Sequence, residues 1–217
     1  MGDNENIVRP GVFIAFEGID GSGKSTQVKK LMDKLSSLDI KCYETKEPTD
    51  SPIGSLIHQI MTGRIIADNK VIASLFIADR VDHLLNSTNG INEKIKDGIA
   101  VITDRYYFSS YAYNSIDLDM AWIISGNSIS ANILRPTITI FLDVPVRNAL
   151  ERINRGRFHK ELYETEERLI KVREKYFQAF DVLQNVEKVA IIDADAGIDA
   201  VTERIWKAVS ELFPNDA

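Results

Sequence analysis

The chain has 217 residues, of which 44% are hydrophobic and 27% are charged, enough to bury the core of one sizeable domain. Its formal net charge is −6, whereas a nucleic-acid-binding protein needs a basic face that neutralises several phosphates, so no nucleic-acid partner is expected. A single cysteine, Cys42, excludes an intrachain disulfide and suits a reducing compartment.

Short apolar runs alternate with helical patterns along most of the chain. A weaker strand with alternating character is predicted at 40–45, and buried strands are predicted at 12–16, 99–103, 138–142 and 189–192. Apolar side chains recur at helical spacing within residues 28–38, 169–183 and 198–212. Because such strands pair in parallel through right-handed crossovers, the sequence predicts an α/β fold. We expect one domain over residues 1–217, an open doubly wound parallel sheet of about five strands flanked by helices.

A complete phosphate-loop pattern, G-x-x-x-x-G-K-[ST], follows the first predicted strand and opens the first predicted helix. Its glycines let backbone amides converge on an anion, and the following helix adds its positive end. The nucleotide-binding residues are therefore predicted to be Gly18, Asp20, Gly21, Ser22, Gly23, Lys24, Ser25 and Thr26. In such loops the lysine reaches the β- and γ-phosphates of ATP, and the Ser25 hydroxyl is a ligand of Mg²⁺. We expect Lys24 to face solvent when the loop holds no nucleotide.

Three later segments carry the residue types that a phosphoryl acceptor needs. Phe76 and Arg80 are four residues apart on a predicted helix, so an aromatic ring and a guanidinium share one face. The third segment begins where a predicted strand ends, which is where ligands of parallel sheets bind. The segments are Glu47-Pro48-Thr49-Asp50-Ser51-Pro52-Ile53-Gly54, Leu75-Phe76-Ile77-Ala78-Asp79-Arg80 and Asp104-Arg105-Tyr106-Tyr107-Phe108-Ser109-Ser110-Tyr111-Ala112-Tyr113. Their order and spacing resemble the thymidylate kinase family of P-loop nucleoside monophosphate kinases, over about residues 13–193.

The resemblance implies how the acceptor nucleoside is held. The ring of Phe76 would stack on thymine, and Arg80 would donate to the carbonyl edge of the base. By position, Ser109 and Ser110 would line the base pocket. Tyr113 would crowd the sugar C2′ and so favour deoxyribose.

The resemblance also implies how the acceptor phosphate and the metal are held. Arg105 would hold the acceptor phosphate, and Asp104 would order the water shell of Mg²⁺. Asp20, which repels nucleotide phosphates, would face the 3′-hydroxyl of the acceptor sugar instead. Bacterial members usually have Gly-Gly where this chain has Thr49-Asp50, and the Asp50 carboxylate would repel an anion unless it points away.

A basic segment at about residues 147–164 resembles the family's lid and contains Arg147, Arg152, Arg155 and Arg157. Some members of the family carry an arginine inside the phosphate loop, where this chain has Gly21, and members without it supply the positive charge from the lid. We therefore expect Arg155 and Arg157, with Lys24 and Arg105, to be the catalytic cations. A charged run of this kind is equally typical of a solvated face.

The expected reaction moves the γ-phosphoryl group of ATP·Mg²⁺ to thymidine 5′-monophosphate (dTMP), giving dTDP and ADP for nucleotide biosynthesis. It needs no general base, because the second pKa of the acceptor phosphate is near 6 and the phosphate is already largely a dianion at pH 7. A kinase for another deoxynucleoside or nucleoside monophosphate stays open; a nucleoside acceptor would need Glu17 or Asp104 as a base. A regulatory nucleotide-binding protein without turnover is a further alternative.

The surroundings of the protein follow from the same features. No apolar stretch approaches the ~20 residues that would span a bilayer, and residues 1–10 lack the apolar run of a signal peptide. We therefore expect a cytoplasmic protein without membrane contact. The resemblance also implies a homodimer, paired through helices beside the site, for which residues 71–85 offer an apolar side.

Overall fold

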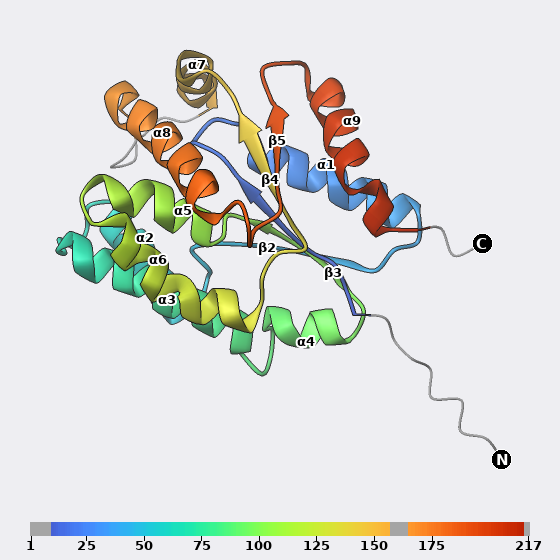
Figure 1. Ribbon diagram of the computed structural model, residues 1–217, viewed down its shortest axis with the longest axis horizontal. Coiled ribbons are helices and arrows are strands. Elements are labelled where there is room, and N and C mark those ends of the chain that lie inside the picture. Colours follow the sequence, from blue (N-terminus) through green and yellow to red (C-terminus); the bar gives the residue numbers. More distant parts are fainter. Residues whose placement is uncertain (1–9, 157–164, 215–217) are drawn as a thin grey trace.

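The computed structural model describes residues 10–156 and 165–214. Its centre is a five-stranded parallel sheet with the strand order β2-β3-β1-β4-β5 (Figure 1). The strands are β1 (Phe13–Glu17), β2 (Cys42–Lys46), β3 (Ala100–Asp104), β4 (Ile138–Asp143) and β5 (Val189–Asp193). The four predicted apolar runs correspond to β1, β3, β4 and β5, and the predicted alternating segment corresponds to β2, with shifts only at the ends. The predicted α/β fold with an open, all-parallel sheet is confirmed.

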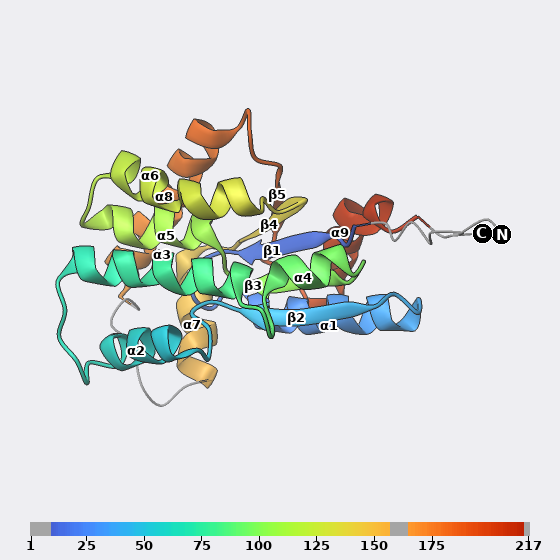
Figure 2. The same ribbon diagram turned by 90° about the horizontal axis from the view of Figure 1, so that it is seen from below.

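Helices cover both faces of the sheet, which buries its three central strands almost completely. Helices α1 and α9 lie together on one face, and α3, α5, α6 and α8 lie on the other (Figures 1 and 2). The helices are α1 (Lys24–Ser37), α2 (Pro52–Met61), α3 (Asn69–Leu85), α4 (Ile91–Lys96), α5 (Tyr107–Tyr113), α6 (Met120–Ile133), α7 (Val146–Gly156), α8 (Glu166–Leu183) and α9 (Ile198–Val209). Within the described ranges, no helix has the length and apolar character that a membrane span requires.

The strand order reverses beside β1, which has β3 on one side and β4 on the other. Ligands of doubly wound sheets bind at such a switch point, beyond the carboxyl ends of the strands. The register pairs Phe16 with Asp104, so the phosphate loop after β1 and the segment after β3 leave the sheet side by side. Two of the motifs read from the sequence therefore meet at one edge of the sheet.

The phosphate loop packs tightly against α7, the helix that contains the first part of the predicted lid. Gly21 has a φ of 77°, and a Cβ placed on it would lie 2.3 Å from the backbone oxygen of Ala149. No side chain fits there unless α7 shifts. This contact agrees with a chain that carries no arginine inside its phosphate loop. Residues 157–164, the second part of the predicted lid, lie outside the described residues.

Candidate active site

The phosphate loop lines a cavity of about 620 Å³ together with residues that follow β3 and β5. The ammonium of Lys24 donates to the backbone oxygens of Gly18 and Ile19, each at 3.0 Å, and the residue is only 6% exposed. The expectation that Lys24 faces solvent is therefore wrong, because the curled loop supplies its own acceptors. Burial, with the nearby charge of Arg105, lowers the pKa of Lys24 to about 8, although three carboxylates oppose the shift.

Oxygen atoms suited to a hard cation lie beside this loop. The Ser25 hydroxyl donates to Oδ2 of Asp104 at 2.6 Å. The other carboxylate oxygen, Oδ1, is buried and has no hydrogen-bond partner among the described residues. Hydroxyl and carboxylate oxygens are the protein ligands that Mg²⁺ prefers, directly or through its waters. The predicted pair of Ser25 and Asp104 therefore fits a magnesium site.

Arg105 leaves β3 in a left-handed backbone conformation, with a φ of 76°. Its guanidinium forms an ion pair with Asp20 and donates to the hydroxyls of Ser109 at 2.9 Å and Tyr113 at 3.3 Å. The Tyr113 hydroxyl in turn donates to the second oxygen of Asp20, at 2.9 Å. Four residues predicted for the acceptor site thus form one cluster, and the side chain of Arg105 is 18% exposed.

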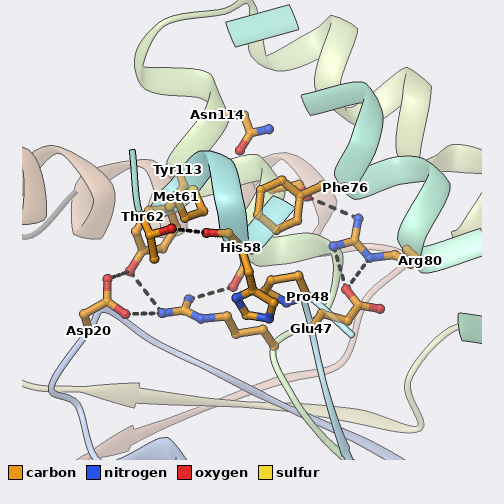
Figure 3. Close-up of a pocket in the computed structure, with 13 residues that line it drawn as sticks. Asp20, Glu47, Pro48, His58, Met61, Thr62, Phe76, Arg80, Tyr113 and Asn114 are labelled. Carbon is orange, nitrogen blue, oxygen red and sulfur yellow. Dashed lines mark hydrogen bonds and ion pairs between the residues drawn. The ribbon is translucent and has the colours of Figure 1, made fainter. Parts of the chain in front are cut away.

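A second cavity, of about 130 Å³, adjoins this cluster (Figure 3). Seven of the residues that line it are those predicted to bind the acceptor, namely Asp20, Phe76, Arg80, Arg105, Ser109, Ser110 and Tyr113. Asp20 and Arg105 line the phosphate-loop cavity as well. The two cavities therefore meet at this ion pair, where a donor phosphate and an acceptor phosphate would face each other.

Comparison with known proteins gives a consistent family. The sequence model of thymidylate kinase matches residues 16–205. This chain belongs to the thymidylate kinase family. A probable thymidylate kinase of Thermococcus kodakarensis is 35% identical over 211 residues, which cover 93% of this chain and 98% of the relative. A putative thymidylate kinase of Treponema pallidum is 35% identical over 202 residues (92% and 95%), and a probable thymidylate kinase of Methanococcus aeolicus is 41% identical over 165 residues (76% of each).

The family's aromatic–arginine pair lies on α3, but its arginine is more enclosed than the sequence suggests. Arg80 is 1% exposed, and its Nε and Nη2 atoms contact Glu47 at 2.8 and 2.7 Å. Its Nη1 donates to the Ser110 hydroxyl at 3.2 Å and to the amide oxygen of Asn127, and Nη2 donates to the backbone oxygen of Tyr106. Protein acceptors thus surround the guanidinium. The guanidinium borders the cavity beside Ser110, which lines it as well.

The departure at Thr49-Asp50 from the bacterial form of the family has a structural explanation. The Thr49 backbone amide donates to the buried carboxylate of Asp79 at 2.8 Å, and its hydroxyl donates to the same carboxylate at 2.5 Å. Asp50 is exposed, pairs with Lys46 at 3.3 Å and does not line the acceptor cavity. The carboxylate that would repel an anion therefore points away from the site, and Thr49 anchors the loop to α3.

Several lining residues have no counterpart among the residues singled out from the sequence. His58 and Met61 reach the cavity from α2, Thr62 directly follows that helix, and Asn114 follows Tyr113 (Figure 3). The amide nitrogen Nδ2 of Asn114 is buried without a partner among the described residues, which makes it an available donor. The sequence hints only at Asn114, which directly follows the segment that ends at Tyr113. The other three could not be found, because no local pattern indicates how α2 packs.

One arginine of the predicted lid lines the phosphate-loop cavity. Arg152 on α7 donates to the backbone oxygen of Ala194 at 3.0 Å and to that of Ser22 at 3.4 Å. Arg147 is exposed and pairs with Glu151 on its own helix. Arg155 lies in the last turn of α7, and its side chain, like the whole of Arg157, falls outside the described part of the chain.

Proposed function

We propose that the chain transfers the γ-phosphoryl group of ATP to dTMP, giving ADP and dTDP. The observation that carries this proposal is the meeting of the two cavities at Asp20 and Arg105. An oxygen of the dTMP phosphate attacks the γ-phosphorus, and the bond from that phosphorus to the β–γ bridging oxygen breaks. Membership in the thymidylate kinase family supports the same reaction.

The donor nucleotide binds in the larger cavity. Its phosphates replace the loop carbonyls as partners of Lys24, and the loop from Gly18 to Thr26 surrounds them with amides. Ser25 and Asp104 would hold Mg²⁺, which neutralises charge on the transferring group when it is bound. Arg152 and the remaining lid arginines, Arg155 and Arg157, add positive charge as the lid, residues 147–164, closes over the phosphates and excludes water.

The acceptor phosphate binds Arg105, and the 3′-hydroxyl of its sugar faces Asp20. No base is required, because the phosphate oxygen already carries its negative charge. Of the two bases that a nucleoside acceptor could use, Glu17 is 0% exposed and lines neither cavity, whereas Asp104 lines the phosphate-loop cavity and accepts a hydrogen bond from Ser25. The position of Glu17 argues against its use as the base of a nucleoside kinase, and the test with thymidine decides whether Asp104 serves as one.

The thymine base lies between Phe76 and the Arg80–Ser110 pair. The 3.2 Å bond from Arg80 Nη1 to the Ser110 hydroxyl is the longer of the two bonds made by that nitrogen. The thymine O4 takes over or shares this donor, while Glu47 keeps the rest of the guanidinium in place. Tyr113, packed beside the sugar, favours the deoxy form.

The function is tested by ADP release from ATP·Mg²⁺ with dTMP, dUMP, dCMP, thymidine or no acceptor. We expect dTMP to be the best acceptor. The kcat/KM for dUMP should be about fourfold lower than for dTMP, since one buried methyl group is worth about 0.8 kcal/mol. The informative pair is dUMP and dCMP, which both lack the methyl group. Cytosine presents a donor to Arg80, so kcat/KM for dCMP is expected to be at least about tenfold lower than for dUMP.

Two outcomes would count against the assignment. If thymidine supports ADP release as fast as dTMP does, the protein is a nucleoside kinase. If ADP is released at the same rate without any acceptor, the protein hydrolyses ATP and is not a nucleotide kinase. Equal rates with dUMP and dCMP would refute only the role of Arg80 and would leave the kinase assignment intact. The variant Phe76→Ala should weaken the binding of dTMP and of dCMP by the same factor, because stacking does not depend on the hydrogen-bonding groups at the edge of the base.

We also propose a homodimer, paired through α3 and α6, which contact each other. Val71 and Leu85 on α3 and Trp122 and Ile129 on α6 are all 45–55% exposed, an unusual amount of open apolar surface on neighbouring helices. Sedimentation at micromolar concentration should give twice the chain mass of 24.4 kDa. The variant Ile129→Glu should shift the mass toward one chain, whereas Ile198→Glu on the opposite face should not.

A further inference from the structure

A buried carboxylate lies beneath the phosphate loop and outside both cavities. Glu17 is the last residue of β1 and is 0% exposed. Its Oε1 accepts hydrogen bonds from the backbone amides of Tyr106 at 2.9 Å and Ser109 at 3.1 Å. Its Oε2 accepts from the hydroxyls of Ser109 at 2.6 Å and Tyr176 at 2.8 Å. Burial raises the pKa of Glu17, and the Ser109 hydrogen bond and the charge of Arg105 oppose that shift.

The four donors connect Glu17 to the arginine of the acceptor site. The Ser109 hydroxyl accepts a hydrogen bond from Nη1 of Arg105 at 2.9 Å and donates one to Oε2 of Glu17 at 2.6 Å. Tyr176 lies 3.0 Å from the same hydroxyl, so Ser109 is fixed from two sides. Both amides held by Oε1 belong to the segment that follows Arg105. Glu17 therefore restrains the backbone and the side-chain partner of Arg105 together.

Arg105 needs such restraint more than an ordinary arginine. Its φ of 76° lies in the left-handed region, which costs energy for a residue with a side chain and persists only when the surroundings impose it. Its backbone amide donates to Phe16 at 2.8 Å, but this bond alone does not direct the guanidinium. The direction of the side chain depends on Ser109, Asp20 and Tyr113, with a longer bond of 3.4 Å to the backbone oxygen of Gly18.

Tyr176 brings a distant helix into this network. It lies in the middle of α8, is 0% exposed and packs edge-on against Tyr113, with ring centroids 6.4 Å apart. It lines neither cavity. The main partners of its hydroxyl are Glu17 and Ser109, so the evident role of this hydroxyl is to hold those two side chains. The backbone oxygen of Gly18 is a weaker partner at 3.5 Å, the limit of hydrogen bonding.

We propose that Glu17 and Tyr176 are positioning residues for Arg105, acting through Ser109 without touching either substrate. The proposal rests on the proposed function, since it takes Arg105 as the group that binds the acceptor phosphate. Loss of the Tyr176 hydroxyl leaves Ser109 and one oxygen of Glu17 less constrained, so Arg105 is held less firmly. The effect should fall on the phosphate of the acceptor and not on its base.

Calorimetric titration of Tyr176→Phe with dTMP and with thymidine separates these two parts of the acceptor. One hydrogen bond to a charged network is worth a factor of roughly 3 to 10 in affinity or more, so dTMP should bind about 3- to 10-fold more weakly than to the wild type. Thymidine, which lacks the phosphate, should bind within about twofold of the wild type. The kcat/KM for dTMP should fall with the dTMP affinity, while KM for ATP stays unchanged.

Tyr107→Phe is the matched control. Tyr107 is also 0% exposed, and its hydroxyl also donates to a buried carboxylate, Glu187, at 2.7 Å, but neither residue lines a cavity or contacts Arg105. This control should lower the melting temperature as Tyr176→Phe does and leave the ratio of dTMP to thymidine affinity unchanged. Glu17→Gln keeps the shape and removes the charge, and it should lower that ratio at least as much as Tyr176→Phe.

The positioning role is overturned if either Tyr176→Phe or Glu17→Gln keeps the wild-type ratio of dTMP to thymidine affinity. It is also overturned if Tyr107→Phe lowers the ratio equally, since the effect would then be one of general stability. A wild-type protein that binds dTMP no better than thymidine would instead refute the proposed function itself.

Discussion

Replacing Lys24 with alanine is expected to lower the turnover of dTMP by at least ~10²-fold while the chain remains folded. In the proposed mechanism the ammonium is the one positive charge that the phosphate loop itself supplies to the β- and γ-phosphates. Its present partners, the backbone oxygens of Gly18 and Ile19, would lose only hydrogen bonds from one donor. Steady-state ADP release should therefore fall strongly, whereas the melting temperature should change little.

Lys29→Ala provides the comparison for this variant. Lys29 lies on the same helix, is exposed and is directed away from the loop, so its removal changes the net charge equally without touching the cavity. We expect wild-type turnover from it. A folded Lys24→Ala protein with near-normal turnover would refute the phosphate-loop assignment.

Arg80→Ala is expected to lower the free energy of unfolding by about 3–5 kcal/mol, an effect far larger than a change of base preference. The side chains of Arg80 and Glu47 are only 1% and 2% exposed, so removing the guanidinium leaves a carboxylate buried without its main counter-charge. His83, at 3.1 Å from the other oxygen of Glu47, replaces only part of that interaction. Urea unfolding followed by circular dichroism measures the loss.

Two further variants distinguish burial from charge as the cause. Arg204→Ala breaks an ion pair with Asp193 in which both side chains are well exposed, 43% and 65%, and it should cost no more than about 1 kcal/mol. Adding Glu47→Gln to Arg80→Ala removes the unpaired charge and should restore part of the lost stability. Equal losses from Arg80→Ala and Arg204→Ala would contradict this account.

The parts of the site that follow from local sequence were predictable. A phosphate loop is a continuous motif, and its place after β1 and before α1 follows from an apolar run and a helical repeat. The acceptor segment after β3 was predictable for a related reason, because parallel strands bring their carboxyl ends to one edge of the sheet. Four strands were located from apolar runs and β2 from a weaker alternating pattern. The signal is strongest for β1, β3 and β4, because a strand buried on both faces has to be apolar along most of its length.

The parts that depend on tertiary packing were not predictable. Two partners of Arg80 lie 33 positions earlier and 47 positions later in the chain, and the five residues from Phe76 to Arg80 contain no information about them. The burial of Lys24 depends on how tightly the loop curls. Helix α2 forms one wall of the acceptor cavity, but its amphipathic pattern would be the same wherever it packed.

The close approach of Gly21 to Ala149 means that the phosphate loop and α7 constrain each other's side chains. A bulkier residue at position 21 would push α7 outward and carry Arg152 away from the nucleotide, so an arginine could not simply be added to the loop of this chain. A loop grafted from a relative would fold well only if the first turns of its own α7 came with it. The two segments are more than a hundred residues apart in sequence, yet a substitution in one has to be matched by a shift or a substitution in the other.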